Sequence, residues 1–588
     1  MDPTLTMIKL LCFLSSMFPE YREHCDYKQA INLSNYQYPT PSNETEGIYR
    51  VAILGTNDIH GAAFPFRYVH PIDNTEYDYG GLQYLANYIR IMRGEWGDRF
   101  LWLDGGDQFQ GKIESKISNG DIIKEFFTTV MVNASSIGNH EWDYGQPFLY
   151  EKLEKSNWNY LAANVLNNEQ KTEFLPNSKV AKIFTMGEVK VGVIGLSTIQ
   201  TPFTTSGDLT NVKFAEYRDI VINLSKSLRE SGANAVVIMS HVGMKCPNDS
   251  VDKMILKVRQ PSTSQGVCDN DEMKVLLESL EPGVVDAVVA GHVHDVAHHW
   301  INGVPVVQSK DGGYFSNIIY LAFDSKTKKI LKDKIEIEGP LPTCRQVFEN
   351  NLNCNYLTKT SAASAGSLRN FIFHNKFMKA DQSLNDLFNK WWKETQSYKV
   401  RVTSTDTILK RGRTEENALG NLISDIYKQV AGADVSIIND GSMRSEWVPG
   451  DIFVEDVYNM FPFDNYLVTI EMTGLQLKQA LSLVQSGSKS FYHTSGLSQL
   501  VSTNPNKLVS VKLYDGTEID EEKVYVVATN DFLAGGGDDF RLVREWYTPV
   551  NQKSYGLLRN IIIEELEKIK ELKLEDLIIS NKRRLQKV

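Results

Sequence analysis

The amino-acid sequence predicts two α/β domains joined by a linking helix, and three observations support this prediction. The chain has 588 residues, which is too long for a single ordinary hydrophobic core. Hydrophobic residues make up 42% of the chain and charged residues 23%, values that are typical of a folded globular protein. From about residue 48 to residue 342, short apolar runs alternate with helical patterns, as they do in layered α/β domains.

The N-terminal residues have the pattern of a short secretory signal. Lys9 precedes an apolar run from Leu10 to Phe18, so we expect a signal peptide at residues 1–24. The chain would then be secreted, or would enter a periplasm or a vesicle lumen; a buried or frayed N-terminal segment is the alternative. No later run approaches the roughly 18 to 20 apolar residues of a membrane span, and the C-terminus is basic and polar, so no membrane anchor is expected.

Net charge and cysteine content restrict the partners and the compartment. The formal net charge of −11 argues against a nucleic-acid-binding surface, and it means that an anionic substrate needs a local cationic site. The pairs Cys246/Cys268 and Cys344/Cys354 are close enough in the sequence for local disulfides, although the sequence does not fix the connectivity.

Five apolar runs are predicted to be strands of the first domain. Short runs of this kind are typical of strands buried on both faces, and helix is the alternative that periodicity alone does not exclude. Polar residues just past such strands face the ligand crevice of an α/β sheet. Each run here breaks into Gly, Asn, Asp or His, in the segments YRVAILGTNDIH, RFLWLDGGDQ, VKVGVIGLST, NAVVIMSHVG and VVDAVVAGHVH.

Residues of the types that bind transition metals recur between these runs. Divalent metals favour imidazole and carboxylate ligands, and a pair of ions can clamp both oxygens of an in-line phosphoryl displacement. Such a pair needs a bridging carboxylate. Asp107 is the natural candidate, because Gly105 and Gly106 let the backbone pass close to an ion. The candidate ligands are Asp58, His60, Asp107, Asn139, His241, His292 and His294.

A single Asp or His beyond a strand is more often a helix cap or a surface group than a metal ligand. Here the same arrangement appears in five separate segments, and this recurrence favours a metal site. Asp58 and His60 stand at alternate positions, as do His292 and His294, so a strand end would point each pair the same way.

A connection and a second domain are predicted for the remaining chain. Residues 343–400 are expected to form an interdomain connection, in which residues 381–400 carry apolar side chains at helical spacing. Residues 401–588 are expected to form a second α/β domain, with a helix at residues 561–578.

The second domain carries residues suited to a nucleotide. Arginine makes paired hydrogen bonds to phosphate oxygens, although a lone arginine is more often a solvated surface charge. Phenylalanines beside Gly and Asp in loops can stack on a purine or pyrimidine ring. The candidates are Arg411 or Arg413, Asn439, Arg444, Phe463 and Phe532.

Together these segments resemble the blocks of the calcineurin-like metallophosphoesterases, and specifically of the 5'-nucleotidase family, from about residue 50 to residue 560. The resemblance implies a four-layer metallophosphoesterase sandwich at residues 48–342, joined by the linking helix to an α/β substrate-binding domain. It implies two divalent ions, with zinc favoured and manganese, cobalt or magnesium as alternatives. One ion would be held by Asp58, His60, Asp107 and His294, and the other by Asp107, Asn139, His241 and His292.

The same resemblance assigns the remaining roles. His140 would stabilise charge on the reacting phosphate, with Asp143 as its orienting partner. Phe463 and Phe532 would stack on the base, and Asp538 would contact the ribose hydroxyls. In this family a large rotation of the second domain carries substrate to the metals. The other implied substrate ligands are Arg413, Asn439 and Arg444, with Arg444 on phosphate.

The sequence departs from the family pattern in places. His294 stands where many relatives carry Gln or Asn, so both imidazoles of its segment could bind metal. Arg411 could replace Arg413 with a one-residue slip. His298 and His299 have no counterpart in the motif and are expected to be ordinary surface residues.

The predicted activity is metal-dependent hydrolysis of nucleoside 5'-monophosphates such as AMP to nucleoside and phosphate. The alternative within the same class is apyrase action on ATP and ADP, or hydrolysis of UDP-sugars, since the same base clamp and metals would serve them. The alternative from another class is a nucleotide-binding or host-interaction protein without catalysis. The complete set of predicted metal ligands argues against this alternative. A nucleotide substrate is the expected partner, and the oligomeric state stays open.

Overall fold

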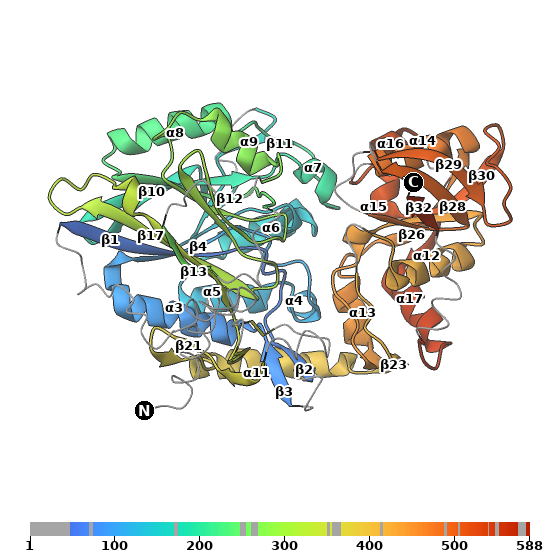
Figure 1. Cartoon of the computed structure of the whole chain (residues 1–588), viewed down its shortest axis with the longest axis horizontal. Coiled ribbons are helices and arrows are strands. Elements are labelled where there is room, and N and C mark those ends of the chain that lie inside the picture. Colours follow the sequence, from blue (N-terminus) through green and yellow to red (C-terminus); the bar gives the residue numbers. More distant parts are fainter. Residues whose placement is uncertain are drawn as a thin grey trace, which may run out of the picture.

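The structure of the chain is a computed structural model, and it shows two domains side by side (Figure 1). The predicted signal peptide and Arg413 lie outside the described residues. The larger domain is formed by the first part of the chain, and the smaller domain begins at β23 (Arg401–Thr405). The described residues are 47–69, 75–169, 175–246, 255–259, 268–349, 353–354, 366–411, 415–486, 491–503, 506–538, 540–546, 552–573 and 584–587.

The larger domain contains two main β-sheets. The first has eight strands, in the order β13 (Ile255–Arg259), β18 (Glu336–Pro342), β17 (Phe315–Asp324), β1 (Ile48–Thr56), β4 (Phe100–Asp104), β5 (Ala134–Ser136), β6 (Asn159–Leu161) and β8 (Ser178–Lys179). The second has six, in the order β15 (Ala297–Ile301), β16 (Val304–Gln308), β14 (Ala287–Ala290), β12 (Ala235–His241), β10 (Val189–Ser197) and β9 (Ala181–Met186). The smaller elements are β2 (Phe66–Val69), β3 (Glu76–Tyr79), β7 (Val165–Asn167), β11 (Val212–Phe214), α4 (Ile113–Ile117), α6 (Gln146–Glu154) and α7 (Thr201–Thr204).

The two sheets lie between two layers of helices, because alternate side chains along each central strand point to opposite faces of its sheet. In β1, Val51 and Ile53 pack into the core between the sheets, whereas Ala52 and Leu54 pack into the core under the helices. The strands β10 and β12 alternate in the same way. The predicted four-layer sandwich is thereby confirmed. Its outer layers are α3 (Leu82–Trp96) and α5 (Asp121–Val130) on the first sheet, and α8 (Arg218–Glu230) and α9 (Glu272–Ser279) on the second.

Parallel pairing brings the carboxyl ends of the central strands together. β1 pairs in parallel with β4, and β4 with β5. In the second sheet, β12 pairs in parallel with both β10 and β14. All five predicted strand segments are therefore strands, and the loops that follow their neighbouring carboxyl ends can meet.

The connection between the domains packs on the larger domain before it crosses to the smaller one. Cys344 and Cys354 form a disulfide within the same core as α3 and α5, and Cys246 and Cys268 form a second disulfide. The linking helix predicted at residues 381–400 is present and runs along the lower edge of the larger domain in Figure 1. The elements are β19 (Gln346–Phe348), β20 (Leu368–Asn370), β21 (Ile372–Phe373), β22 (Lys376–Phe377) and α11 (Asn385–Thr395).

The smaller domain is built on a five-stranded sheet with helices on both faces. Its strand order is β27 (Tyr492–Ser495), β24 (Val435–Asn439), β30 (Val524–Asn530), β26 (Tyr466–Thr473) and β31 (Gln552–Leu557). Helices α12 (Ala418–Ala431) and α17 (Leu558–Glu567) contribute to one core, and α14 (Gly474–Ser486) contributes to the other. The smaller elements are β25 (Gly450–Phe453), β28 (Leu497–Thr503), β29 (Asn506–Leu513), β32 (Leu585–Lys587), α13 (Val454–Met460), α15 (Asp531–Ala534) and α16 (Arg541–Trp546).

One expectation from the sequence is wrong, and a second is met with different bounds. His298 and His299, expected at the surface, are only 1% and 5% exposed. They lie in β15, which contacts both α9 and β18, so neighbouring elements enclose this strand. The helix expected at residues 561–578 is present but spans Leu558–Glu567, because the chain then turns away and Leu572 pairs with Thr405. Residues 574–578 of this expectation lie outside the described residues.

Candidate metal centre and substrate cavity

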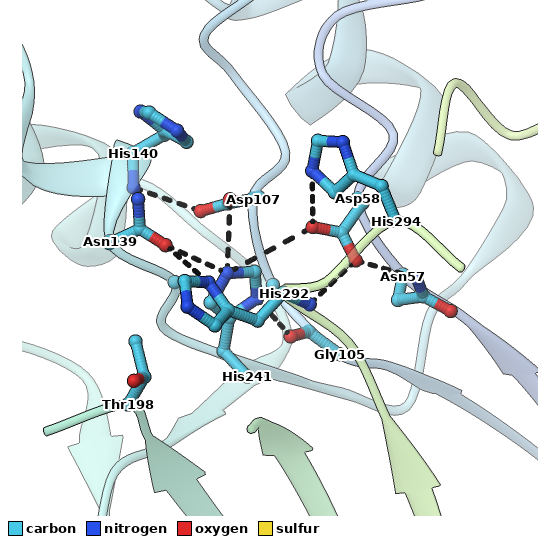
Figure 2. Close-up of polar contacts among 12 residues, drawn as sticks. Asn57, Asp58, Gly105, Asp107, Asn139, His140, Thr198, His241, His292 and His294 are labelled. Carbon is cyan, nitrogen blue, oxygen red and sulfur yellow. Dashed lines mark hydrogen bonds and ion pairs between the residues drawn. The ribbon is translucent and has the colours of Figure 1, made fainter. Parts of the chain in front are cut away.

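All seven predicted metal ligands lie in one cluster at the carboxyl ends of the parallel strands. Figure 2 labels six of them, all but His60. Six of the seven are buried. Asp58 and His60 follow β1, Asp107 follows β4, Asn139 follows β5, His241 ends β12, and His292 and His294 follow β14.

Four of these side chains converge on a single point. The ligand atoms of Asp58, His60, Asp107 and His294 all lie within 4.8 Å of one another. The Nε2 atoms of His60 and His294 face each other at 2.9 Å, and His294 Nε2 lies 3.2 Å from Asp58 Oδ1. Imidazole nitrogens and a carboxylate oxygen that face one another are the donors a transition metal prefers.

Asp107 also faces a second group of ligands. Its Oδ2 atom lies 3.6 Å from His60 Nε2 on one side and 3.0 Å from His241 Nε2 on the other. The Oδ1 atom of Asn139 lies 3.0 Å from both His241 Nε2 and His292 Nδ1. One carboxylate is thus shared by two ligand groups, as a bridging ligand must be.

The buried carboxylates test whether these residues fit metal ions. Asp58 Oδ1 and Asp107 Oδ2 are buried and face imidazole nitrogens, with Asp58 Oδ1 3.2 Å from His294 Nε2 and Asp107 Oδ2 3.0 Å from His241 Nε2. Two buried carboxylates this close to each other are costly unless positive charge neutralises them. The residues therefore fit two divalent ions on either side of Asp107.

Hydrogen bonds from Nδ1 turn the Nε2 atoms of two histidines toward the cluster. His60 donates from Nδ1 to the carbonyl oxygen of Gln110 at 2.7 Å. His241 donates from Nδ1 to the carbonyl oxygen of Gly105 at 2.8 Å. These bonds fix the orientation of each ring and leave Nε2 as the atom that would bind a metal.

The electrostatics of the cluster suit the binding of divalent cations. Burial lowers the pKa of His60 to about 3, so this imidazole is neutral, which is the form that binds metal. Burial would also lower the pKa of His241, but Asp107 and Asp58 outweigh it and raise the pKa to about 10. The carboxylates thus draw a proton to His241, and a divalent cation would replace that proton.

The backbone of the ligand loops is strained. A non-glycine residue with a positive φ angle is uncommon and costs roughly 1 to 3 kcal/mol. Such strain persists where the surrounding fold imposes it, and it clusters at functional sites. The positive φ angles of five ligands are 50° for Asp58, 49° for His60, 57° for Asp107, 82° for His292 and 58° for His294.

Gly138 has no side chain, and the space that a side chain would fill is occupied by Asp107. A Cβ atom at Gly138 would lie 2.1 Å from Asp107 Oδ1 and 2.6 Å from its backbone nitrogen. We expect Gly138→Ala to displace Asp107 and to weaken binding of zinc or manganese by about tenfold or more, measured by calorimetric titration. Gly94→Ala is the matched control, since a Cβ there meets nothing within 4 Å. Equal metal affinity in both variants would contradict this account of Gly138.

His140 and Asp143 form a pair at the edge of the metal cluster. His140 Nδ1 donates to Asp143 Oδ2 at 2.7 Å, and Thr205 Oγ1 donates to the other carboxylate oxygen at 2.7 Å. Burial would lower the pKa of His140, but Asp143 and Asp107 outweigh it and raise the pKa. The ring therefore tends to carry positive charge next to the cluster.

Glu141 is a residue of this site to which the sequence analysis gave no role. It is fully buried, and its carboxylate accepts hydrogen bonds from the backbone nitrogens of Asp107 at 2.8 Å, Gly138 at 2.7 Å and Gln108 at 2.6 Å. It thereby ties the loop after β4 to the loop after β5. Its place beside His140 was a signal, but spacing alone does not show that the two loops meet.

A cavity of about 210 Å³ lies beside the metal cluster and is lined by both domains. Arg444 comes from the smaller domain, and its Nη2 atom lies 3.4 Å from His60 Nε2 and 3.3 Å from His294 Nε2. The Phe463 ring stacks on His140, with centroids 5.2 Å apart. The predicted substrate residues that line the cavity are Arg411, Asn439, Arg444, Phe463, Phe532 and Asp538.

The far side of the cavity is held by polar contacts within the smaller domain. Asn439 donates from Nδ2 to Asp538 Oδ2 at 2.7 Å, and Asn530 donates to Asn439 Oδ1 at 3.1 Å. Arg411 Nη2 lies 3.4 Å from Asp440 Oδ2. The cavity thus joins the predicted metal ligands and Arg444 at one end to these polar side chains at the other.

Comparison with known proteins matches two separate parts of the chain to family models. The family described as calcineurin-like phosphoesterase matches residues 51–296, and that described as 5'-nucleotidase, C-terminal domain, matches residues 397–545. The chain is 26% identical over 575 residues to a 5'-nucleotidase-related protein of Glossina morsitans morsitans, covering 90% of this chain and 94% of the relative. It is 26% identical over 550 residues to the snake venom 5'-nucleotidase of Gloydius brevicauda, covering 85% and 83%. Its fold resembles the crystal structure of a 5'-nucleotidase precursor from Thermus thermophilus, with a TM-score of 0.71, 21% identity and coverage of 92% and 99%.

Proposed function

Because the chain belongs to the 5'-nucleotidase family and is a metal-dependent nucleotide phosphohydrolase, we propose that it hydrolyses nucleoside 5'-monophosphates, AMP foremost, to nucleoside and phosphate. One observation carries the proposal. A single cavity joins the ligand cluster around Asp107 to Arg444, Phe463 and Asp538 of the second domain.

The metal ligands follow from the two groups around Asp107. Asp58, His60 and His294 would hold one ion, and Asn139, His241 and His292 the other, with Asp107 between them. When bound, two divalent ions supply positive charge that stabilises the phosphate oxygens during an in-line displacement. The predominance of imidazole nitrogen favours zinc, with manganese, cobalt or magnesium as alternatives.

We assign the catalytic roles in the chain to His140 and Asp143. Asp143 accepts the Nδ1 proton of His140, so the Nε2 side of the ring is left to face a phosphate oxygen. Its raised pKa favours the charged imidazole, which donates a hydrogen bond to the phosphate as negative charge grows. His140 is also fixed by its backbone nitrogen, which donates to Asp107 Oδ1 at 2.9 Å.

The second domain would hold the nucleotide. We assign Arg444 to the phosphate, which is supported by the contacts of its guanidinium with His60 and His294. Phe463 and Phe532 would stack on the base, and Asp538, held by Asn439, would accept from the ribose hydroxyls. Arg411 lines the cavity, and Arg413, the residue that the family pattern favours, remains a proposed ligand from sequence alone.

Two disulfides and the relatives support a location outside the cytoplasm. Disulfides persist in oxidising compartments, and one relative is a venom enzyme. We therefore propose that the protein is secreted. We also propose that the chain consists of a metallophosphoesterase domain at residues 48–342, a linker at residues 343–400 and a substrate-binding domain at residues 401–588. Within the described residues, no helix combines the length and apolar character that a bilayer crossing requires.

A phosphate-release assay with AMP, ADP, ATP and UDP-glucose tests the proposed activity. We expect AMP to give the highest kcat/KM, and we expect a chelator to abolish turnover until zinc or manganese is added back. His140→Ala is the control for contaminating phosphatase. Faster turnover of ADP and ATP would identify an apyrase instead. Nucleotide binding without any chelator-sensitive turnover would contradict an enzyme altogether.

A further inference from the structure

One buried arginine of the smaller domain holds the loop that carries Phe463. Arg559 lies in α17 and is 4% exposed. Its Nη1 atom donates to the backbone carbonyl oxygens of Phe461 at 3.0 Å, Pro462 at 2.8 Å and Phe463 at 3.1 Å. Its Nη2 atom donates to the carboxylate of Asp464. One guanidinium thus binds four consecutive residues.

These bonds determine the path of the loop. A guanidinium is planar and rigid, so the groups that it binds must lie in fixed directions. The carbonyl groups of Phe461 and Pro462 belong to buried residues and need a hydrogen-bond donor. Arg559 is itself held in place, because its guanidinium lies 4.5 Å from the centre of the Tyr458 ring.

The same loop faces the reactive end of the cavity, as Arg444 does. The Phe463 ring stacks on His140, and Arg444 lies over it at 5.6 Å. Asp464 pairs with Lys116 of α4 in the larger domain. A shift of this loop would therefore move Phe463 relative to the cavity.

We propose that Arg559 is a positioning residue for nucleotide recognition, because it holds Phe463 where its ring can stack on the base. Arg559 is not among the described residues that line the cavity, so it acts through the loop and without touching the substrate. The inference rests on the proposed function, in which Phe463 binds the base of a nucleotide.

A comparison of two substrates distinguishes a role in base recognition from a general effect on protein stability. AMP and ribose 5-phosphate share the sugar and the phosphate, but only AMP has a base. We expect Arg559→Lys to lower kcat/KM for AMP by about tenfold, mainly through KM, and to change that for ribose 5-phosphate by less than about twofold. We expect Phe463→Ala to lower the AMP value by about 10- to 100-fold. Adding Arg559→Lys to Phe463→Ala should then have little further effect, because the two residues act through one contact.

Arg584→Lys is the matched control. Arg584 is also buried in the smaller domain, and its Nη1 atom donates to the carbonyl oxygens of Asn421 and Thr494. This variant should keep the wild-type ratio of the two substrates. Should Arg559→Lys not fold, Asp464→Asn removes the charged partner at a half-exposed side chain and should give the same selective loss.

The outcomes distinguish the inference from the proposed function. Equal loss on both substrates, or an additive loss in the double variant, would overturn the role of Arg559 while wild-type AMP hydrolysis stands. A wild-type protein that turns over ribose 5-phosphate as well as AMP would overturn both, because no recognition of the base would then exist to be positioned.

Discussion

Replacing Asp107 by asparagine is expected to lower kcat/KM for AMP by about a thousandfold or more. The Oδ2 atom of Asp107 is shared between His60 and His241, so one substitution removes negative charge from both ligand groups. The loss of one cation, or of both, removes several kcal/mol of charge stabilisation from the displacement. The rate is measured by phosphate release, and the metal content of the protein is measured by inductively coupled plasma mass spectrometry.

The metal content of the Asp107 variant should fall below two ions per chain. Asp219→Asn is the matched control, since the Asp219 side chain is 86% exposed in α8 and pairs only with the neighbouring Arg218 among the ion pairs of the described residues. An Asp107→Asn protein that keeps two ions and most of its activity would contradict a shared carboxylate.

Replacing His140 by alanine is expected to lower kcat by about a hundred- to ten-thousandfold without loss of metal. Charge stabilisation by a positioned donor contributes rate factors of this size. The His140 ring is bound to Asp143 and belongs to neither ligand group, so the metal content should stay at two ions per chain. This result separates the role of His140 from that of Asp107.

The Asp143→Asn variant tests the partner of His140. The asparagine amide can keep a contact with His140 but no longer favours the charged imidazole, so we expect a smaller loss of kcat than in His140→Ala. A His140→Ala protein with nearly full activity would remove this residue from the mechanism. Loss of metal in that variant would instead make His140 part of the ligand set.

Much of the metal centre was predictable because its pattern is local. Each of Asp58, Asp107 and His241 follows or ends an apolar strand, and parallel strands place such ends together. The two local disulfides and the linking helix were also visible in short segments of sequence. Where a few adjacent residues determine the outcome, the sequence pattern was sufficient.

The rest depended on contacts between distant segments. His298 and His299 are buried because α9 and β18 cover their strand, and no nearby residue signals that cover. The role of Glu141 appears only once the loops after β4 and β5 meet. The contact of Arg444 with His60 requires the two domains to be placed against each other, which spacing does not encode.

The central claim is that Asp107 is shared by two cations, and anomalous diffraction from a crystal grown with zinc or manganese tests it most directly. We predict two anomalous peaks that both contact the Asp107 carboxylate, one among Asp58, His60 and His294 and the other among Asn139, His241 and His292. A single peak, or peaks that do not contact Asp107, would contradict the account.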